Sequence, residues 1–96
     1  MIRDVKIIHF IPGRVRLRIQ EIKENAKLAR EIQQAFINIP GITTVDMNPL
    51  TGSVLIKYDP KSLLQQASLD QLSETLTKYF PSLDLPKLLA WIKSSH

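Results

Sequence analysis

Residues 9–19 read His-Phe-Ile-Pro-Gly-Arg-Val-Arg-Leu-Arg-Ile, and from Arg14 onward charged and apolar residues alternate. Successive side chains of a β-strand point to opposite faces, so a period of two predicts a strand with one buried face. The apolar residues belong to the core, and Arg14, Arg16 and Arg18 form a row on the other face. The stretch therefore predicts one strand of a sheet whose second face is cationic.

Residues 4–11, just upstream, are rich in β-branched and aromatic side chains, which favours an extended conformation. Pro12 and Gly13 then interrupt the pattern, because Pro cannot donate to a strand ladder and Gly accepts a positive φ. Two interpretations remain open: one long bulged strand over residues 4–20, or a tight hairpin. In a continuous strand, His9 would share the apolar face.

The rest of the chain predicts three helices and a second hairpin. Asn25, Ser68 and Asp84 each precede apolar residues at helical spacing and are suited to be N-caps, with Ser68 and Gln71 resembling a capping box. Proline, alone or followed by glycine, ends the first two helical patterns. The predicted elements are helices over residues 26–39, 68–80 and 84–95 and strands over residues 42–48 and 53–58.

The strand predicted over residues 42–48 has mixed polar and apolar positions. Strict alternation places Thr43, Val45 and Met47 on one face and Ile42 on the other. Met47 is interpreted as a core residue rather than a metal ligand, because a flexible thioether fills irregular gaps well.

Length and composition indicate one globular domain over residues 1–96, with 44% hydrophobic and 23% charged residues. No apolar run approaches the roughly 20 residues of a membrane span, and no signal peptide is visible. The chain has no cysteine, which excludes disulfides, thiolate nucleophiles and cysteine-based metal sites. A cytoplasmic location is the expectation.

The positive charge of the chain is concentrated at one end. The net charge is +4; residues 1–23 contain six Lys or Arg and two acids, whereas residues 24–96 contain seven of each sign. This excess favours an acidic partner, a phosphate group or an anionic surface. The alternative is a solvated strand face with no partner.

Residues 26–60 carry a set of short motifs in a fixed order. The motifs are Ile39-Pro40-Gly41-Ile42, Val45-Asp46-Met47-Asn48, Thr51-Gly52-Ser53-Val54 and Tyr58-Asp59-Pro60. This ordered set resembles the heavy-metal-associated (HMA-like) domain of metallochaperones and P-type metal-transporting ATPases. The resemblance implies an α+β, ferredoxin-like βαββαβ fold with helices on one face of an open antiparallel sheet.

Two departures separate the chain from that family pattern. The family's Cys-x-x-Cys metal loop corresponds to residues 21–25, Glu-Ile-Lys-Glu-Asn, so its two-thiolate handling of soft metals does not transfer. A helix over residues 84–95 stands where the last strand is expected. One edge of the first strand would then be free, unless residues 2–11 or another chain covers it.

The segment His-x-x-Pro-Gly-Arg-x-Arg-Leu-Arg, at residues 9–18, resembles a cysteine-free branch of the same family. Such domains occur alone or attached to P-type cation-transporting ATPases. The resemblance covers about residues 7–60 and implies an association with metal transport without defining a ligand.

His9 is the candidate ligand for a metal cation, iron or zinc, or for haem. One histidine is an incomplete site, because zinc usually takes four protein ligands or three and a water. Asp4, Glu21 or Glu24 are candidate oxygen donors to a harder cation, but nothing in the sequence brings them near His9. A structural role and a contact with a partner are the alternatives.

Arg14, Arg16 and Arg18, with Lys6, are the candidate contacts for a partner or an anion. Alternate residues of a strand lie about 7 Å apart, and neighbouring like charges repel each other unless an acidic group lies close enough to neutralise them. That acid is either internal, with Asp46 as the candidate, or supplied by a partner or phosphate. Nucleic acid is disfavoured because no aromatic residues interleave with the arginines.

The predicted C-terminal helix carries Leu88, Trp91 and Ile92 at helical spacing. This apolar stripe either packs against the domain or docks on a partner. The sequence contains no phosphate loop, no Ser-His-Asp set and no carboxylate pair of defined geometry, so a non-enzymatic protein is predicted.

These observations favour a binding module, accessory or regulatory to metal-cation transport, that contacts a partner such as a P-type cation-transporting ATPase or binds a cation weakly. Three alternatives remain. They are self-association through the edge of the first strand, a metal or haem sensor using His9, and binding of an anionic ligand or nucleic acid by the arginine face.

Overall fold

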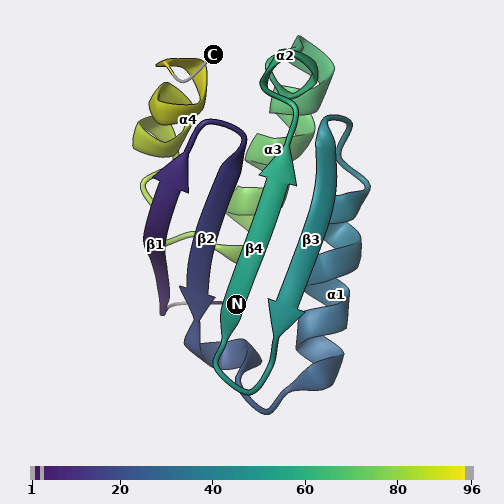
Figure 1. The fold of residues 1–96 in the computed structure, drawn as a ribbon, viewed down its shortest axis with the longest axis vertical. Helices are drawn as coiled ribbons and strands as arrows, with labels where there is room; N and C mark the ends of the chain where they lie inside the picture. Colours follow the sequence, from purple (N-terminus) through teal and green to yellow (C-terminus); the bar gives the residue numbers. More distant parts are fainter. Residues whose placement is uncertain (1, 3, 95–96) are drawn as a thin grey trace.

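The computed structural model of the chain describes residues 2 and 4–94, which form a four-stranded antiparallel sheet with its helices on one side (Figure 1). The strands lie in the order β1-β2-β4-β3. They are β1 (Val5–Ile11), β2 (Arg14–Ile19), β3 (Ile42–Asn48) and β4 (Ser53–Tyr58). The helices are η1 (Gln20–Ile22), α1 (Ala26–Ile37), α2 (Pro60–Leu63), α3 (Gln66–Tyr79) and α4 (Leu85–Ser94). This is the predicted α+β, open-faced, ferredoxin-like class.

The N-terminal segment forms a hairpin and not one long strand. Pro12 and Gly13 make the turn, Gly13 with a φ of 82°, and Ile11 pairs with Arg14. Strand β1 thereby covers the edge of β2 that the missing last strand would leave free. The edge of the sheet on this side therefore belongs to β1 and not to β2, and self-association through a strand edge stays a prediction.

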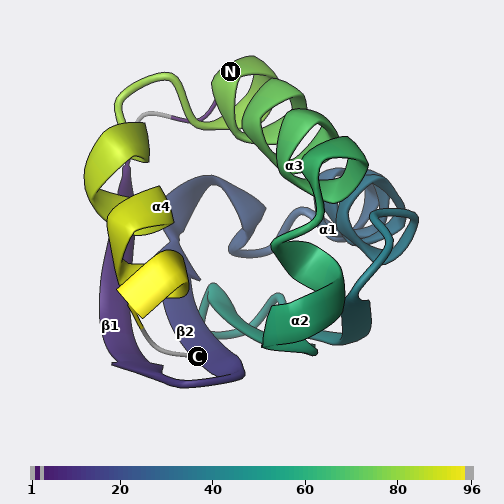
Figure 2. The ribbon, with the colours of Figure 1, turned by 90° about the horizontal axis from the view of Figure 1, so that it is seen from above.

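Helices α1, α3 and α4 lie on the inner face of the sheet, and no helix of the described chain lies over the other face (Figures 1 and 2). Val15, Leu17 and Ile19 of β2 are all buried in this core, as their alternation predicts. The first helix begins as predicted, because the Asn25 side-chain oxygen accepts a hydrogen bond from the Leu28 N–H at 3.2 Å.

A β-bulge in β3 corrects the predicted alternation. The pairing of β3 with β4 shifts between Ile42 and Thr44, so Thr43 becomes the extra residue. Ile42 is consequently buried with Val45, while Thr43 is exposed. The predicted strict alternation put Ile42 on the wrong face of the sheet. The extra residue, Thr43, shifts the alternation of side chains by one position, so residues before and after it no longer follow one pattern.

The later helices differ from the prediction in one cap. Helix α3 begins at Gln66, so Ser68 lies inside it and is buried instead of capping it. Asp84 does cap α4, since its carboxylate accepts from the Lys87 N–H at 3.1 Å. The helix expected over residues 84–95 spans Leu85–Ser94, and residue 95 lies outside the described part of the chain.

Gly52 joins the β3–β4 turn to the end of β2. Its N–H donates to the Asn48 carbonyl at 2.8 Å, and its own carbonyl accepts from the Ile19 N–H at 2.7 Å. Its φ is 78°, and an added Cβ would lie 2.7 Å from the Ile19 carbonyl oxygen. Only glycine fits both the conformation and the close approach.

Candidate interaction surface on the open face

The register of the sheet builds a row of cations across its open face. Arg14, Arg16 and Arg18 of β2 stand opposite Lys57, Leu55 and Ser53 of β4. On the other side, β1 places Ile11, His9 and Lys6 opposite the same three arginines. We call the resulting surface the cationic face; its charged members are Lys6, Arg14, Arg16, Arg18 and Lys57.

Lys57 belongs to the cationic face but was missing from the sequence prediction. It is exposed and lies directly opposite Arg14. The sequence shows that Lys57 alternates with the apolar residues Ile56 and Tyr58 and so belongs to the open face of β4. It does not show which strand lies beside β4. Only the order β1-β2-β4-β3 brings Lys57 beside the arginines.

Like charges that face each other across a strand pair destabilise a sheet slightly. Arg14 and Lys57 form such a pair, and Arg16 and Arg18 lie on the same face one step further along. An anion placed over this surface would relieve their repulsion. The cationic face is therefore suited to bind negative charge.

Asp46 is the only carboxylate in the four strands. It pairs with Leu55, which separates it from Arg16 by one whole strand, or about 10 Å between backbones. No ion pair joins Asp46 to the three arginines within the chain as described. The internal charge ladder predicted from the sequence does not form, so the face stays strongly positive.

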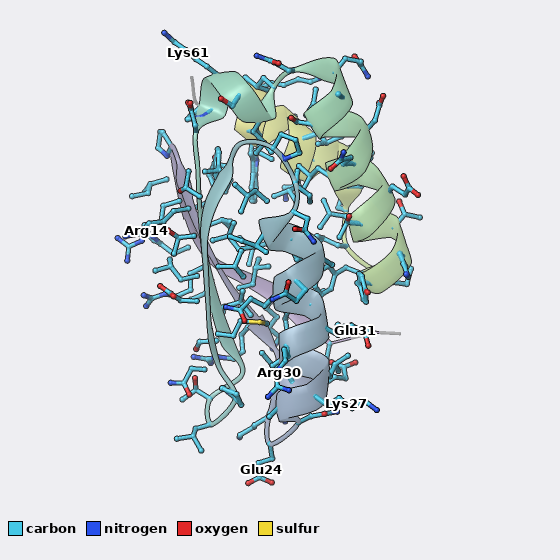
Figure 3. The ribbon with its side chains drawn as sticks, turned by 90° about the vertical axis from the view of Figure 1, so that its right-hand side faces the viewer. Arg14, Glu24, Lys27, Arg30, Glu31 and Lys61 are labelled. Carbon is cyan, nitrogen blue, oxygen red and sulfur yellow. The ribbon has the colours of Figure 1, made fainter. Side chains whose placement is uncertain are left out.

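Figure 3 shows that Arg14 points to the side of the sheet away from α1, which carries Lys27, Arg30 and Glu31. The exposed side of α1 therefore has both signs of charge, with Glu24 at its base. The concentration of positive charge is a property of the open sheet face and not of the whole surface.

His9 is an exposed residue of this same face. The pairing of β1 with β2 shifts between Ile7 and His9, and this bulge turns His9 toward Arg16. A continuous regular strand would have placed His9 on the apolar face. The chain forms a hairpin instead, and the bulge between Ile7 and His9 puts His9 on the open face. Ile8 and Ile11 beside it are 47% and 40% exposed, so the rim of the cationic face includes apolar surface.

The oxygen donors considered with His9 lie at the other end of the hairpin. The Asp4 N–H donates to a Glu21 carboxylate oxygen at 3.2 Å, beside the end of β2. Among residues 2 and 4–94, no group of three or more His, Cys, Asp or Glu side chains is placed to hold a metal ion. His96 lies outside those residues. A metal or haem site at His9 therefore stays an untested alternative.

The loop that corresponds to the family's metal loop has a different construction here. Helix η1 occupies it, and Ile22 fills its interior with no exposed surface. Glu24 has a φ of 59°, and its N–H donates to the Pro49 carbonyl at 2.8 Å. With an apolar side chain inside and no thiolate or imidazole in residues 20–25, these residues do not fit a soft-metal site.

The apolar stripe of α4 faces the domain. Leu88 and Ile92 are buried in the core, and the Trp91 ring packs on Phe10 with 5.6 Å between centroids. Lys87 lies over the Trp91 ring, its Nζ atom 5.2 Å from the centroid. Of the two roles predicted for this stripe, the structure shows packing, so Leu88 and Ile92 are not free for a partner.

The open antiparallel sheet, its one-sided helices and the absence of cysteine define a ferredoxin-like module without thiolate ligands. The model of the heavy metal associated domain 2 family matches residues 2–78, and the chain belongs to this family. Helix α4 follows the matched segment.

A manganese-exporting P-type ATPase of Mycobacterium leprae (strain TN) is 31% identical to the chain over 61 residues. The matched part is 64% of this chain and 8% of the ATPase, so the chain spans less than a tenth of that relative. No solved structure matches. Within the described residues, no helix has the length and apolar character to cross a membrane.

Proposed function

We propose that this chain is a non-enzymatic binding module that regulates or assists metal-cation transport by contacting a protein partner through the cationic face. Membership of a heavy-metal-associated family and the similarity to a P-type ATPase support the link to cation transport. The loop at residues 20–25 supports a role in contact rather than in thiolate-based metal transfer. The proposal keeps the cytoplasmic location and the single domain expected from the sequence.

The observation that carries this proposal is the unbalanced charge of the sheet. Five cations share the open face with Asp46 as the sole carboxylate of the strands. A surface of one sign attracts a partner of the opposite sign and speeds their encounter. The exposed Ile8 and Ile11 add apolar contact at the rim, as protein interfaces commonly require.

The partner we propose is an acidic surface of a P-type cation-transporting ATPase. Exposed charges interact over about 10 Å at 0.1 M salt, so binding should weaken as salt increases. Strand-edge self-association is not needed for this contact, because the cationic face is presented by each copy of the chain.

The test is binding of the chain to the P-type cation-transporting ATPase of the same organism, held in nanodiscs of zwitterionic lipid. We expect Arg16→Glu to weaken binding at least about tenfold, because it reverses the centre of the cationic face. Lys27→Glu is the matched control. It makes the same change of charge at an exposed residue of α1, on the other side of the molecule.

Equal affinities of wild type and Arg16→Glu would contradict the proposal, as would equal losses for Arg16→Glu and Lys27→Glu. Nanodiscs without ATPase, prepared with anionic lipid, separate headgroup binding from protein contact. Binding to those discs alone would refute a protein partner.

A further inference from the structure

The edge of the sheet formed by β1 is open, whereas the opposite edge is partly occupied. At the opposite edge, α1 lies alongside β3, and the Gln33 side-chain amide donates to the Val45 carbonyl at 2.8 Å (Figure 1). Among the described residues, hydrogen bonds to the backbone of β1 come from β2 alone. Strand β1 therefore offers the freer row of unpaired backbone groups, which is what another strand needs in order to pair.

The outward N–H and C=O groups of β1 belong to Val5, Ile7 and Phe10. In an antiparallel pair, residues direct these groups toward the partner strand and away from it in alternation. The Asp4 carbonyl accepts from the Gln20 N–H at 3.1 Å, so Val5 directs its groups outward, and Ile7 does the same two residues further on. The bulge that follows makes Phe10 the next outward residue.

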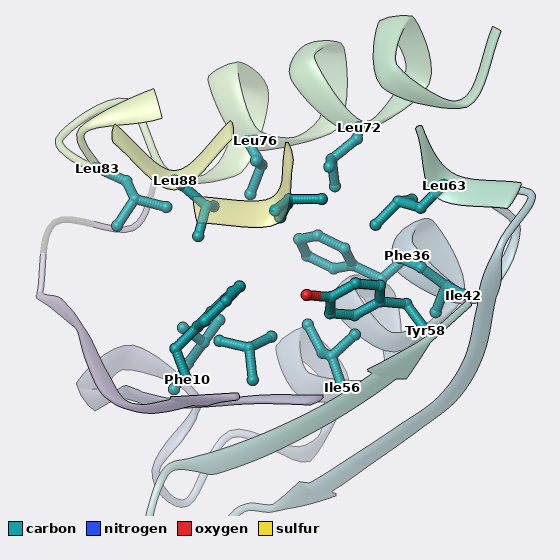
Figure 4. A pocket seen from close by; sticks show the side chains of 13 residues that line it. Phe10, Phe36, Ile42, Ile56, Tyr58, Leu63, Leu72, Leu76, Leu83 and Leu88 are labelled. Carbon is teal, nitrogen blue, oxygen red and sulfur yellow. The ribbon is translucent and has the colours of Figure 1, made fainter. Parts of the chain in front are cut away.

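A hollow beside Phe10 has room for an apolar side chain on the inner side of this edge. Phe10 points from β1 toward the helices, and its ring packs on Trp91 of α4 (Figure 4). The described lining of the hollow is Phe10, Pro12, Trp91 and Ser94, with no residue of β2, β3 or β4. An apolar side chain of a strand added to β1 would meet this aromatic surface, and Trp is among the residues that contribute most to binding.

The other face of the same edge is cationic. Lys6 is exposed on β1 itself, and Arg16 and Arg18 lie on the neighbouring strand, about 5 Å further from the edge. A strand added to β1 would bring its own open-face side chains to about 5 Å from Lys6. Opposite charges across a strand pair stabilise it, so acidic side chains are favoured on that face of the added strand.

We propose that the partner binds by adding a β-strand to β1, with acidic side chains on the open face and an apolar side chain beside Trp91. The inference rests on the proposed function for the acidic character of the partner, and it adds the way in which that partner binds. A flexible segment fits this edge better than a second copy of the chain, because the bulge after Ile7 bends the edge. Pairing of two copies would also join two cationic faces in one sheet.

The test uses two synthetic peptides of equal length and charge, each with as many aspartates as valines. In one peptide the two residues alternate, so a strand places every acid on one face; in the other they form two blocks. The measurement is amide hydrogen exchange of the ¹⁵N-labelled full chain by NMR. We expect the alternating peptide to slow exchange of the Val5, Ile7 and Phe10 amides at least about tenfold, and the block peptide to leave it unchanged.

Lys6→Glu should weaken binding of the alternating peptide about tenfold, because it places a like charge beside the added strand. Lys27→Glu on α1 is the matched control and should bind as the wild type does. Unchanged exchange of the three edge amides would overturn the proposal, as would equal protection by both peptides. Protection that grows with chain concentration in the absence of peptide would assign the edge to a second copy, which also overturns it.

The peptide assay and the ATPase assay can fail separately. Edge protection by the peptide, in a chain that does not bind the ATPase, would support the strand site and refute the proposed function. Binding to the ATPase through the cationic face, without edge protection by the peptide, would support the proposed function and refute the strand site.

Discussion

Replacement of Tyr58 by phenylalanine should stabilise the protein. The Tyr58 hydroxyl leaves water on folding and gains no hydrogen bond from the described residues. A buried group of this kind costs about 1–3 kcal/mol of folding free energy. Phenylalanine keeps the ring, with its contacts in the core, and removes only the unpaired oxygen.

The expected gain in the free energy of unfolding is at least about 1 kcal/mol. For a domain of this length, each kcal/mol corresponds to a change of about 4–8 °C in Tm. Circular dichroism during heating and urea titration both measure the effect.

Tyr79→Phe is the matched control, because Tyr79 is only half-buried and lies at the end of α3. We expect it to change stability by no more than about 0.5 kcal/mol, as surface substitutions usually do. A loss of stability in Tyr58→Phe would refute the reasoning. It would mean that the hydroxyl is hydrogen-bonded in solution, since removing a satisfied bond typically costs about 0.5–1.5 kcal/mol.

Three further substitutions test the fold and the site. Gly52→Ala should destabilise the protein by more than about 1 kcal/mol in urea titrations, because alanine is strained at positive φ and its Cβ would strike the Ile19 carbonyl. Asn25→Ala should cost about 1 kcal/mol in the same assay by removing the cap on the Leu28 N–H, and an unchanged midpoint would contradict that role. Calorimetric titration with zinc, iron(II) and haem should give wild type and His9→Ala the same affinity, because one exposed imidazole makes an incomplete site. A clear loss in His9→Ala would instead assign the metal or haem to that residue.

Much of the cationic face was predictable because a strand has a side-chain period of two. The alternation of residues 14–19 separates arginines from core residues whatever the strand pairs with. Lys57 could not be predicted as part of this face, because its position beside Arg14 depends on which strands are neighbours. The exposure of His9 could not be predicted either, because it follows from a β-bulge, and nothing in the sequence marks the extra residue of that bulge.

The loop at residues 20–25, which stands in place of the family's metal loop, was also predictable only in part. The absence of cysteine already excluded a thiolate site. That Ile22 fills the loop, and that the Glu24 backbone is held by Pro49, depends on contacts between segments far apart in the chain.

By itself, the sequence determined the local features of this protein: where strands and helices run, which residues of β2 are buried, and that the excess positive charge lies in residues 1–23. These follow from periodicity, caps and turn residues, which act over a few positions. The tertiary structure decided that β1 closes the edge of β2, that Lys57 joins the arginines while Asp46 stays apart, and that the Tyr58 hydroxyl is buried without a hydrogen-bond partner among the described residues. Each of these depends on strand order and packing between distant segments, so the row of arginines becomes a binding surface only within the folded sheet.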